Sequence, residues 1–219
     1  MRLNDCHNVA DFRRLARARL PSPIFNYIDG AADDGRTKLR NSASFDDCDL
    51  VPNVLAGVSD IDMAVTVMGK RIDMPLMLSP TALQRLFHWQ GERAVASVAQ
   101  RFNTWFGISS LATVSIEEVG EKIKTPKLFQ LYIHKDKGLN TSMIERCKAA
   151  KFDAIALTVD TIVSGNRERC LRSGFTSPPR FTPESVLSYA IHPMWALNYM
   201  FREKFSLPNL QTHVDAGTN

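Results

Sequence analysis

Cysteine is scarce in this sequence, and its four copies stand far apart, at positions 6, 48, 147 and 170. No C-x-x-C pair occurs, so the sequence predicts neither a zinc site nor a disulfide framework, and a reducing cytoplasmic setting fits best. Excess charge is also missing, because 27 Lys and Arg against 23 Asp and Glu leave a formal net charge of only +4. Nucleic acid is therefore not an expected partner.

Long apolar runs are absent as well. A membrane-spanning helix needs roughly 20 apolar residues, and the nearest candidate, from Val186 to Phe201, is interrupted by Ser188, His192 and Pro193. We therefore expect peripheral membrane association through residues 186–205, on the inner face of the membrane, rather than a membrane span. The first seven residues contain no apolar stretch of the signal-peptide type, so a cytoplasmic protein is expected.

Familiar nucleotide and metal motifs are missing too. Neither G-x-G-x-x-G nor G-x-x-x-x-G-K-[ST] occurs, so the sequence supports neither a Rossmann dinucleotide site nor a P-loop. The five histidines are scattered without any i, i+4 pair, and no metal site is predicted. Any bound nucleotide must therefore be held in another way.

The sequence does have enough apolar residues, 44% of 219, to bury a substantial core. Residues 1–62 suit an N-terminal helical cap with short helices broken at Pro21 and Pro23. Residues 63–74 suit a β-hairpin, with Gly69-Lys70 as the turn between two strand-like runs.

The pattern then changes to short apolar runs alternating with helical segments, which indicates a parallel sheet covered by helices. Helices are expected from about 91 to 101, after the capping-box pattern Ser115 to Glu118, and after the similar pattern Ser142 to Glu145. Residues 75–175 are thus expected to form four βα units, and 176–219 a loop and helical insertion after the fourth strand. The expected strands are Pro75–Ser79, Thr104–Ser109, Lys127–Tyr132 and Asp153–Asp160.

Each expected strand ends in polar residues, and the carboxyl ends of parallel strands are where α/β folds build their sites. A closed (β/α)8 TIM barrel needs eight such units and about 250 residues, so we expect an α/β barrel truncated after about four units. A complete four-stranded open sheet is the alternative that the pattern leaves open. A barrel lyase or aldolase is disfavoured, because no strand-end lysine is present to form a Schiff base.

Six segments together resemble the FMN-dependent 2-hydroxy-acid dehydrogenases and oxidases, a family that includes flavin-type L-lactate dehydrogenase, glycolate oxidase and mandelate dehydrogenase. The resemblance covers the N-terminal half of the family, and the segment Gly165 to Arg169 looks closest to the bacterial L-lactate dehydrogenases. The segments, in order, are Phe25–Gly30, Ser79–Ala82, Ile108–Ser110, Phe129–Tyr132, Ala156–Thr161 and Gly165–Arg169.

The resemblance implies FMN as the cofactor and assigns six residues to it. Pro80, Thr81 and Ala82 would lie against the flavin ring, where a close and rigid approach is needed. Ser109, Gln130 and Thr158 would hydrogen-bond the polar edge of the ring and so tune how readily it accepts a hydride equivalent. Without the resemblance, the two hydroxyl residues would be interpreted as ordinary strand-end caps.

The resemblance also implies a site for a small 2-hydroxy acid. Tyr27 would bind the substrate carboxylate and Tyr132 its hydroxyl or keto oxygen, whereas each would otherwise be read as a tyrosine with its ring in the core. Asp160 would orient the catalytic histidine, and Arg167, otherwise a solvated loop residue, would stabilise negative charge near the substrate. The catalytic assignments are thus Tyr132, Asp160 and Arg167.

The sequence departs from the family's pattern in several places. Leu111 stands where glycolate-oxidising members have tryptophan, Ile162-Val163 replaces a proline-containing turn, and Cys170 stands where aspartate is common. The Ser-Asn-His-Gly setting of the histidine base is lacking, and His88 and His134 are interpreted as surface residues.

We therefore expect the parent enzyme to oxidise a lactate-like L-2-hydroxy acid to the 2-keto acid, and the isolated chain to be inactive and to bind FMN weakly. The electron acceptor stays open between oxygen, a quinone and a cytochrome, and the parent is expected to be a homo-oligomer. The alternative function is a non-catalytic half-barrel that self-associates or binds a partner through its open sheet edge.

Overall fold

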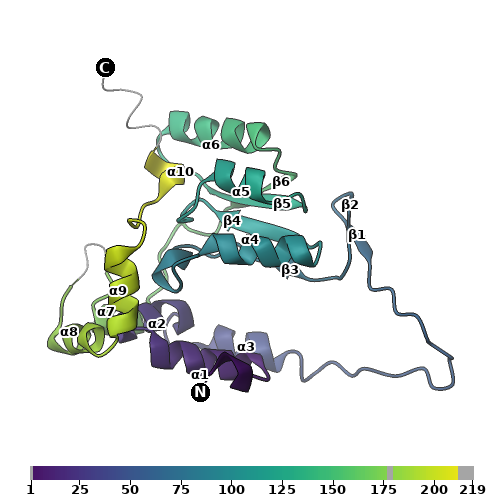
Figure 1. The fold of residues 1–219 in the computed structure, drawn as a ribbon, viewed down its shortest axis with the longest axis horizontal. Helices are drawn as coiled ribbons and strands as arrows, with labels where there is room; N and C mark the ends of the chain where they lie inside the picture. The colour runs from purple at the N-terminus through teal and green to yellow at the C-terminus, as the bar shows by residue number, and fades with distance from the viewer. Residues whose placement is uncertain (1, 177–179, 212–219) are drawn as a thin grey trace. The chain divides into compact units, whose positions relative to one another are not determined.

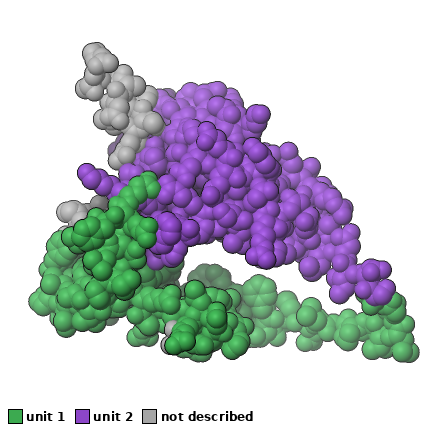
Figure 2. All heavy atoms as spheres, in the orientation of Figure 1, with its two compact units in different colours: residues 1–58, 163–203 green, residues 59–162, 204–219 purple. Residues whose placement is uncertain are grey.

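A computed structural model describes residues 2–176 and 180–211 of the chain. It contains two compact units: unit 1 comprises Met1–Val58 with Val163–Glu203, and unit 2 comprises Ser59–Ile162 with Lys204–Asn219 (Figure 2). The four-part division of the sequence stays a prediction, and residues 177–179 and 212–219 of its last part lie outside the described residues.

Unit 2 is built on a four-stranded sheet in which every neighbouring pair is parallel (Figure 1). The strand order is the chain order, β3-β4-β5-β6. All four predicted strands are present, but the first and the fourth are each shorter than expected, and the second begins one residue later than expected. Their bounds are β3 Met77–Leu78, β4 Trp105–Ser109, β5 Lys127–Tyr132 and β6 Ala154–Thr158.

Three helices cover one face of this sheet (Figure 1): α4 (Glu92–Arg101), α5 (Ile116–Lys122) and α6 (Lys137–Ala149). Their apolar sides form a core with alternate residues of the two central strands, because side chains along a strand point to opposite faces. The other face therefore receives the remaining strand residues, among them Ser109 and Gln130. The strand residues in the core are Phe106, Ile108, Phe129 and Leu131.

One helix start was predicted correctly and one wrongly. The Ser115 side chain caps α5 by accepting a hydrogen bond from the backbone of Glu118. The pattern Ser142 to Glu145, however, lies inside α6, whose cap is Asp136, which accepts a bond from the backbone of Leu139. A serine followed three residues later by glutamate also occurs within helices, so this pattern alone does not locate a helix start.

The hairpin is confirmed, with antiparallel strands β1 (Val65–Val67) and β2 (Lys70–Ile72). Its turn lies one residue earlier than predicted, because Met68 and Gly69 both adopt positive φ, at 48° and 73°. Two positive φ values match the twist of two-residue hairpins. Unit 2 also contains the short helices η2 (Gln84–Leu86) and α10 (Pro208–Gln211).

Unit 1 is helical. Its N-terminal helices were predicted to be broken at both Pro21 and Pro23, but the structure has a single break, at Pro21. α1 ends at Arg19 and α2 begins at Ser22, so Pro23 lies in the first turn of α2, where a missing backbone N–H costs nothing. In the part of the chain described, every helix falls short of the length and apolarity needed to cross a membrane. The helices of unit 1 are η1 Leu3–Asp5, α1 Val9–Arg19, α2 Ser22–Asp29, α3 Arg36–Ala43, α7 Glu168–Ser173, α8 Pro183–Ala190 and α9 Pro193–Phe201.

Candidate functional site

A row of hydrogen-bonded side chains crosses the carboxyl ends of three neighbouring strands in unit 2. The Ser109 hydroxyl donates to Oε1 of Gln130 at 2.9 Å, and Nε2 of Gln130 donates to the Thr158 hydroxyl at 2.6 Å. The register explains this contact, because Ser109 on β4 lies directly opposite Gln130 on β5. We call Ser109, Gln130 and Thr158 the polar row.

Ser110, which received no role from the sequence, ties the polar row to the next residues of β5. Its hydroxyl donates to the carbonyl of Gln130 at 2.6 Å and accepts from the backbone N–H of Tyr132 at 3.1 Å. Ser110 is fully buried, so this hydroxyl has no competing water. The signal in the sequence was a second serine directly after the apolar strand that ends at Ser109, but the burial of Ser110 is known only from the structure.

The loop after β3 packs against β4 through Pro80. A Cβ atom added at Gly107 would lie 2.6 Å from both Cγ and Cδ of Pro80, so only glycine allows this approach. Thr81 follows with its hydroxyl 3.4 Å from the carbonyl of Ser79, and its side chain is exposed, while Ala82 is half-buried. The predicted flavin-facing segment is therefore held on the sheet beside β4.

These residues fit the polar edge of a flavin. Within the contacts of the described residues, the polar row leaves one N–H of Gln130 and the hydroxyl hydrogen of Thr158 available as donors. Pro80 packs directly over Gly107 on this face, and Ala156, the register partner of Gln130, has only a methyl group. The same face thus offers directed donors beside little side-chain bulk, which a planar ring requires.

Two further predicted residues belong to the ends of the same strands. Tyr132 is the last residue of β5, is half-buried, and lies opposite Thr158 in the register. Asp160 follows two residues after the end of β6 and is exposed, and its carboxylate makes no hydrogen bond or ion pair with any residue that the structure describes. Its carboxylate is thus accessible to a partner from outside the described chain.

In unit 1 the structure brings together Tyr27 and Arg167, which are 140 residues apart in the sequence. The Arg167 guanidinium lies 4.8 Å from the centroid of the Tyr27 ring and also donates to the Tyr27 carbonyl. The ring of Phe175 lies 4.6 Å from the Tyr27 ring. Nε of Arg167 is buried without a partner among the described residues.

Cys170 is buried in α7, and its thiol lies 3.9 Å from the carbonyl of Asn26 in α2.

A cluster of charged side chains around Asp29 joins α2 to α1, α3 and α7, and it was not predicted from the sequence. Nε and one terminal nitrogen of Arg13 donate to the two oxygens of the Asp29 carboxylate, at 2.6 and 3.0 Å. The charged nitrogens of Lys38 and Arg169 lie 3.5 and 3.8 Å from the same carboxylate. The hydrogen bond from Arg13 lowers the pKa of Asp29 below its usual range. Asp29 and Arg169 each stand two residues from a member of the Tyr27 and Arg167 pair.

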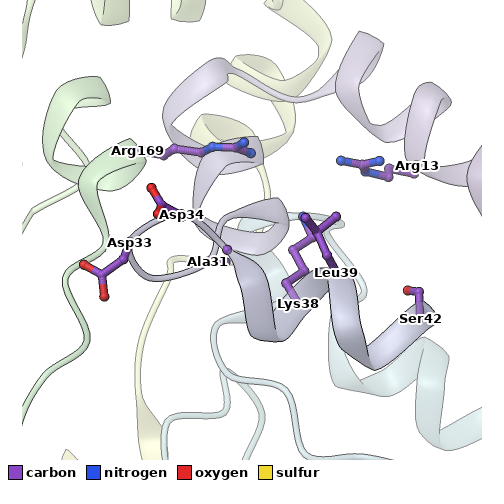
Figure 3. Close-up of a pocket in the computed structure, with 9 residues that line it drawn as sticks. Arg13, Ala31, Asp33, Asp34, Lys38, Leu39, Ser42 and Arg169 are labelled. Carbon is purple, nitrogen blue, oxygen red and sulfur yellow. The ribbon is translucent and has the colours of Figure 1, made fainter. Parts of the chain in front are cut away.

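The cations of this cluster line a cavity of about 270 Å³ in unit 1. Figure 3 shows Arg13 and Arg169 extending toward each other above Lys38 and Leu39. Asp33 and Asp34 also line the cavity, so its positive and negative side chains are nearly balanced. We interpret it as a gap within the ion-pair network and not as the candidate site.

The two histidines that were interpreted as surface residues differ. His88 is exposed, as predicted. His134 is half-buried, and its Nε2 atom is fully buried without a partner among the described residues, so the prediction is wrong for this ring. The cause is local, because Asn140 bonds the backbone N–H and carbonyl of His134 and holds the start of α6 against the end of β5.

Comparison with known proteins places this geometry. The model of the FMN-dependent dehydrogenase family matches residues 16–218. Glycolate oxidase 1 of Oryza sativa subsp. indica is 38% identical over 180 residues, which are 82% of this chain and 49% of the relative. L-lactate dehydrogenase of Vibrio parahaemolyticus serotype O3:K6 is 35% identical over 204 residues, which are 93% of this chain and 54% of the relative.

Solved structures agree. The monotopic membrane protein (S)-mandelate dehydrogenase superposes with a TM-score of 0.87 at 30% identity, covering 94% of this chain and 55% of that one. A lactate oxidase of Pediococcus acidilactici reaches a TM-score of 0.75 at 30% identity, covering 88% of this chain and 53% of that one. The chain thus spans about half the length of the relatives that it matches.

The predicted resemblance is confirmed, and so is the predicted fold, four βα units of a (β/α)8 barrel in place of a complete open sheet. The chain therefore belongs to the FMN-dependent dehydrogenase family.

Proposed function

We propose that this chain supplies part of the FMN site and part of the substrate site of an enzyme that oxidises an L-2-hydroxy acid to a 2-keto acid. The observation that carries the proposal is the polar row, Ser109, Gln130 and Thr158, at the carboxyl ends of the strands. When bound there, FMN would accept the hydride equivalent that leaves the substrate. The organisation of the row supports a rigid set of donors for the polar edge of the ring.

The residues toward FMN have two separate tasks in this proposal. Gln130 and Thr158 donate hydrogen bonds, and Ser109 holds the Gln130 amide in the orientation that makes this donation possible. Pro80 to Ala82 lie against the ring, with Pro80 fixed on β4 by the absence of a side chain at Gly107. Rigid donors need no reorganisation when charge develops on the cofactor.

The residues toward the substrate are proposed to work through charge and directed bonds. Tyr27 binds the carboxylate, Tyr132 bonds the hydroxyl or keto oxygen, and Arg167 stabilises negative charge. Arg167 is suited to this role because the Tyr27 ring and carbonyl hold its guanidinium in place. Asp160 would orient a histidine base. The Ser-Asn-His-Gly setting of that base does not occur in this sequence, so we assign proton removal to no residue of this chain.

A flavin titration tests the proposal. We expect FMN fluorescence to be quenched saturably and weakly by the chain, while NAD+ does not compete, and Gln130→Leu should remove the quenching. Thr66→Val, on the exposed hairpin strand β1, is the control and should bind FMN as the wild type does. Failure of the wild-type chain to quench FMN, or equal quenching by Gln130→Leu, would contradict the proposal.

We further propose that α8 and α9 bind a membrane surface from the cytoplasmic side. Large apolar side chains of this segment are exposed, and Trp195 stacks on Tyr199 with ring centroids 5.2 Å apart, in a helix too short to span. Aromatic and apolar residues on short surface helices are typical of interfacial binding. The structurally similar (S)-mandelate dehydrogenase is described as monotopic. The exposed apolar residues are Val186, Leu187, Ile191, Met194, Leu197, Met200 and Phe201.

Sedimentation with lipid vesicles tests this surface. The wild-type chain should sediment with vesicles, and the double variant Met194→Glu with Phe201→Glu should stay in the supernatant. Leu55→Glu is the control, because Leu55 is an apolar residue of unit 1 that lies outside α8 and α9 and is even more exposed than Met194 and Phe201. Equal sedimentation of the wild type and the double variant would refute the membrane proposal.

The electron acceptor, whether oxygen, a quinone or a cytochrome, and the homo-oligomeric parent remain predictions.

A second candidate function, self-association as a half-barrel, is favoured by one observation on β6. Within the described residues, β6 pairs with a strand on one side only. Ile155 and Leu157 lie opposite Phe129 and Leu131, yet they are 41% and 54% exposed while those partners are buried. Unpaired apolar strand edges favour association. A concentration-independent monomer in analytical ultracentrifugation would exclude this candidate.

A further inference from the structure

The loops that follow β3 and β4 are joined by a backbone hydrogen bond at Leu111, whose own N–H bonds the side chain of Ser109. The N–H of Leu83 donates to the Leu111 carbonyl at 3.1 Å, and the N–H of Leu111 donates to the Ser109 hydroxyl at 3.1 Å. Leu111 therefore connects the flavin-facing segment, which ends one residue before Leu83, with the first member of the polar row. A shift of this loop would displace both sets of residues.

The hydrogen bond between Leu83 and Leu111 holds Leu83 in a strained backbone conformation. Leu83 has φ 59° and ψ 32°, the left-handed conformation that leucine rarely adopts. Such conformations persist only where the surroundings over-determine them, and they are concentrated at functional sites. The Leu83 carbonyl also accepts a hydrogen bond from the backbone N–H of Leu86 at 3.0 Å, but that bond lies within the same turn and does not attach it to the rest of the sheet.

Glu92 and Thr113 provide the hold. Glu92, the first residue of α4, is fully buried, and its two carboxylate oxygens accept from the backbone N–H and the hydroxyl of Thr113, at 3.0 and 2.6 Å. Because the hydroxyl has one hydrogen, donation to Glu92 turns a lone pair toward Arg85, whose backbone N–H donates to it at 3.3 Å. The strained residue is thus held from both sides, through Leu111 and through Arg85.

Packing leaves no room for this arrangement to relax. A Cβ atom at Gly91 would lie 2.5 Å from Cγ of Arg85 and 3.3 Å from the hydroxyl of Thr113, and Gly91 itself has φ 51°. The Arg85 side chain is 9% exposed and Thr113 is 2% exposed. The buried Glu92 carboxylate, the Thr113 hydroxyl and the turn at Leu83 therefore form one closely packed set.

We propose that Glu92 and Thr113 are positioning residues that act through Arg85 and Leu111 to hold the Pro80–Ala82 segment in place relative to Ser109 for flavin binding. This inference rests on the proposed function. The hydrogen bonds of Glu92 and Thr113 described above go to each other and to Arg85, and not to the predicted flavin-binding residues. Their effect is transmitted by the backbone of the two loops.

Hydrogen exchange of the full 219-residue chain tests the inference without a flavin. In Thr113→Val we expect the amides of Leu83 and Arg85 to exchange about tenfold faster. The amides of Ile108 and Phe129 in the sheet should change far less. Thr113→Ser keeps the hydroxyl and should restore slow exchange. Glu92→Gln, which keeps the side-chain volume, should accelerate the same two amides and serves if Thr113→Val does not fold.

Thr125→Val is the matched control. Thr125 is as buried as Thr113, but its hydroxyl has no partner among the described residues, so its loss should leave exchange at Leu83 and Arg85 unchanged. The inference is overturned if these amides keep their wild-type rates in both Thr113→Val and Glu92→Gln, or if Thr125→Val accelerates them equally.

FMN titration of the same variants separates the inference from the proposed function. We expect Thr113→Val to weaken FMN binding about tenfold, and Thr113→Ser to restore it. Equal FMN affinity in the wild type and Thr113→Val would overturn the positioning role while leaving the proposed function intact. Absence of FMN binding from the wild-type chain would instead refute the proposed function, whatever the exchange rates are.

Discussion

Replacing Gln130 with leucine tests whether the polar row is a connected unit. The substitution keeps approximate volume and removes two hydrogen bonds, one from Ser109 and one to Thr158. Thr158 is half-buried and can bond water instead, so its share of the loss is small. Ser109 is 3% exposed, and its hydroxyl loses its acceptor in a place that water does not reach.

The magnitude follows from these two cases. A stranded buried donor costs about 1–3 kcal/mol, and an ordinary hydrogen bond contributes about 0.5–1.5 kcal/mol net. We therefore expect Gln130→Leu to lower the free energy of unfolding by about 2–3 kcal/mol. In the double variant Ser109→Ala with Gln130→Leu, no hydroxyl is stranded. The losses of unfolding free energy measured for the two single variants should therefore add up to about 1–2 kcal/mol more than the loss measured for the double variant.

Urea unfolding measures these values, with Trp105 as the reporter because it is fully buried at the start of β4. Trp89 and Trp195 should be replaced with phenylalanine so that the fluorescence reports on Trp105 alone, which lies in unit 2. Thr66→Val should change the free energy of unfolding by less than about 0.5 kcal/mol. If the losses at Ser109 and Gln130 add to within about 0.5 kcal/mol, the two side chains are not coupled and the reasoning is wrong.

Three other predictions concern charge, burial and turnover. Asp29→Asn should cost about 1–2 kcal/mol near pH 7, since the exposed side of Arg13 limits the value of the ion pair. Because the pKa of Asp29 is lowered in the folded state, this contribution should be present above the ordinary aspartate pKa of about 4 and vanish as the pH falls through the folded value; an equal loss at about pH 3 in urea unfolding would contradict it. Burial raises the pKa of Cys147 to about 12, so iodoacetamide should label the exposed Cys48 in the native chain and Cys147 only after unfolding, which mass spectrometry detects. Because the folded state favours the protonated Cys147 thiol, the free energy of unfolding should fall as the pH rises above the unfolded thiol pKa of about 8.5. Cys147→Ala should remove this fall in stability at alkaline pH. Finally, L-lactate should not bleach the visible absorbance of FMN added to the chain, and stoichiometric bleaching with turnover would show that a catalytic base is present after all.

The elements that carry the site were predictable because their patterns are local. The apolar runs ending at Ser109 and Tyr132 were short, were separated by helical segments and ended in polar residues, and parallel strands bring such ends to one edge. The side chains of the polar row do meet there. The roles of these residues came from the family resemblance and stay predictions until FMN binding is measured.

The errors arose where local patterns are ambiguous. The pattern Ser142 to Glu145 could equally lie inside a helix, and only the contact of Asp136 with the backbone of Leu139 defines the start of α6. The hairpin turn moved because Met68 adopts a positive φ, which its residue type does not suggest. Neither outcome is encoded in the few residues around the pattern.

The features missed altogether depend on residues far apart in the sequence. Glu92 meets Thr113 across 21 residues, and Arg13 meets Asp29 across 16, with no periodicity that links them. Charged residues in such places are usually interpreted as solvated, so burial had to be seen before a role was inferred. The resemblance implied that Tyr27 and Arg167 both lie near the substrate, but their direct contact was not predicted.

The most direct test of the central claim is an amide NMR titration of the chain with FMN. The account predicts that chemical-shift changes concentrate at Thr81, Ala82, Ser109 and Thr158, which stand at or after the carboxyl ends of the strands. Lys127 and Asp153, at the opposite ends of the same sheet, should stay unchanged. Changes centred on Lys127 and Asp153, or spread evenly over the chain, would contradict the flavin site proposed here.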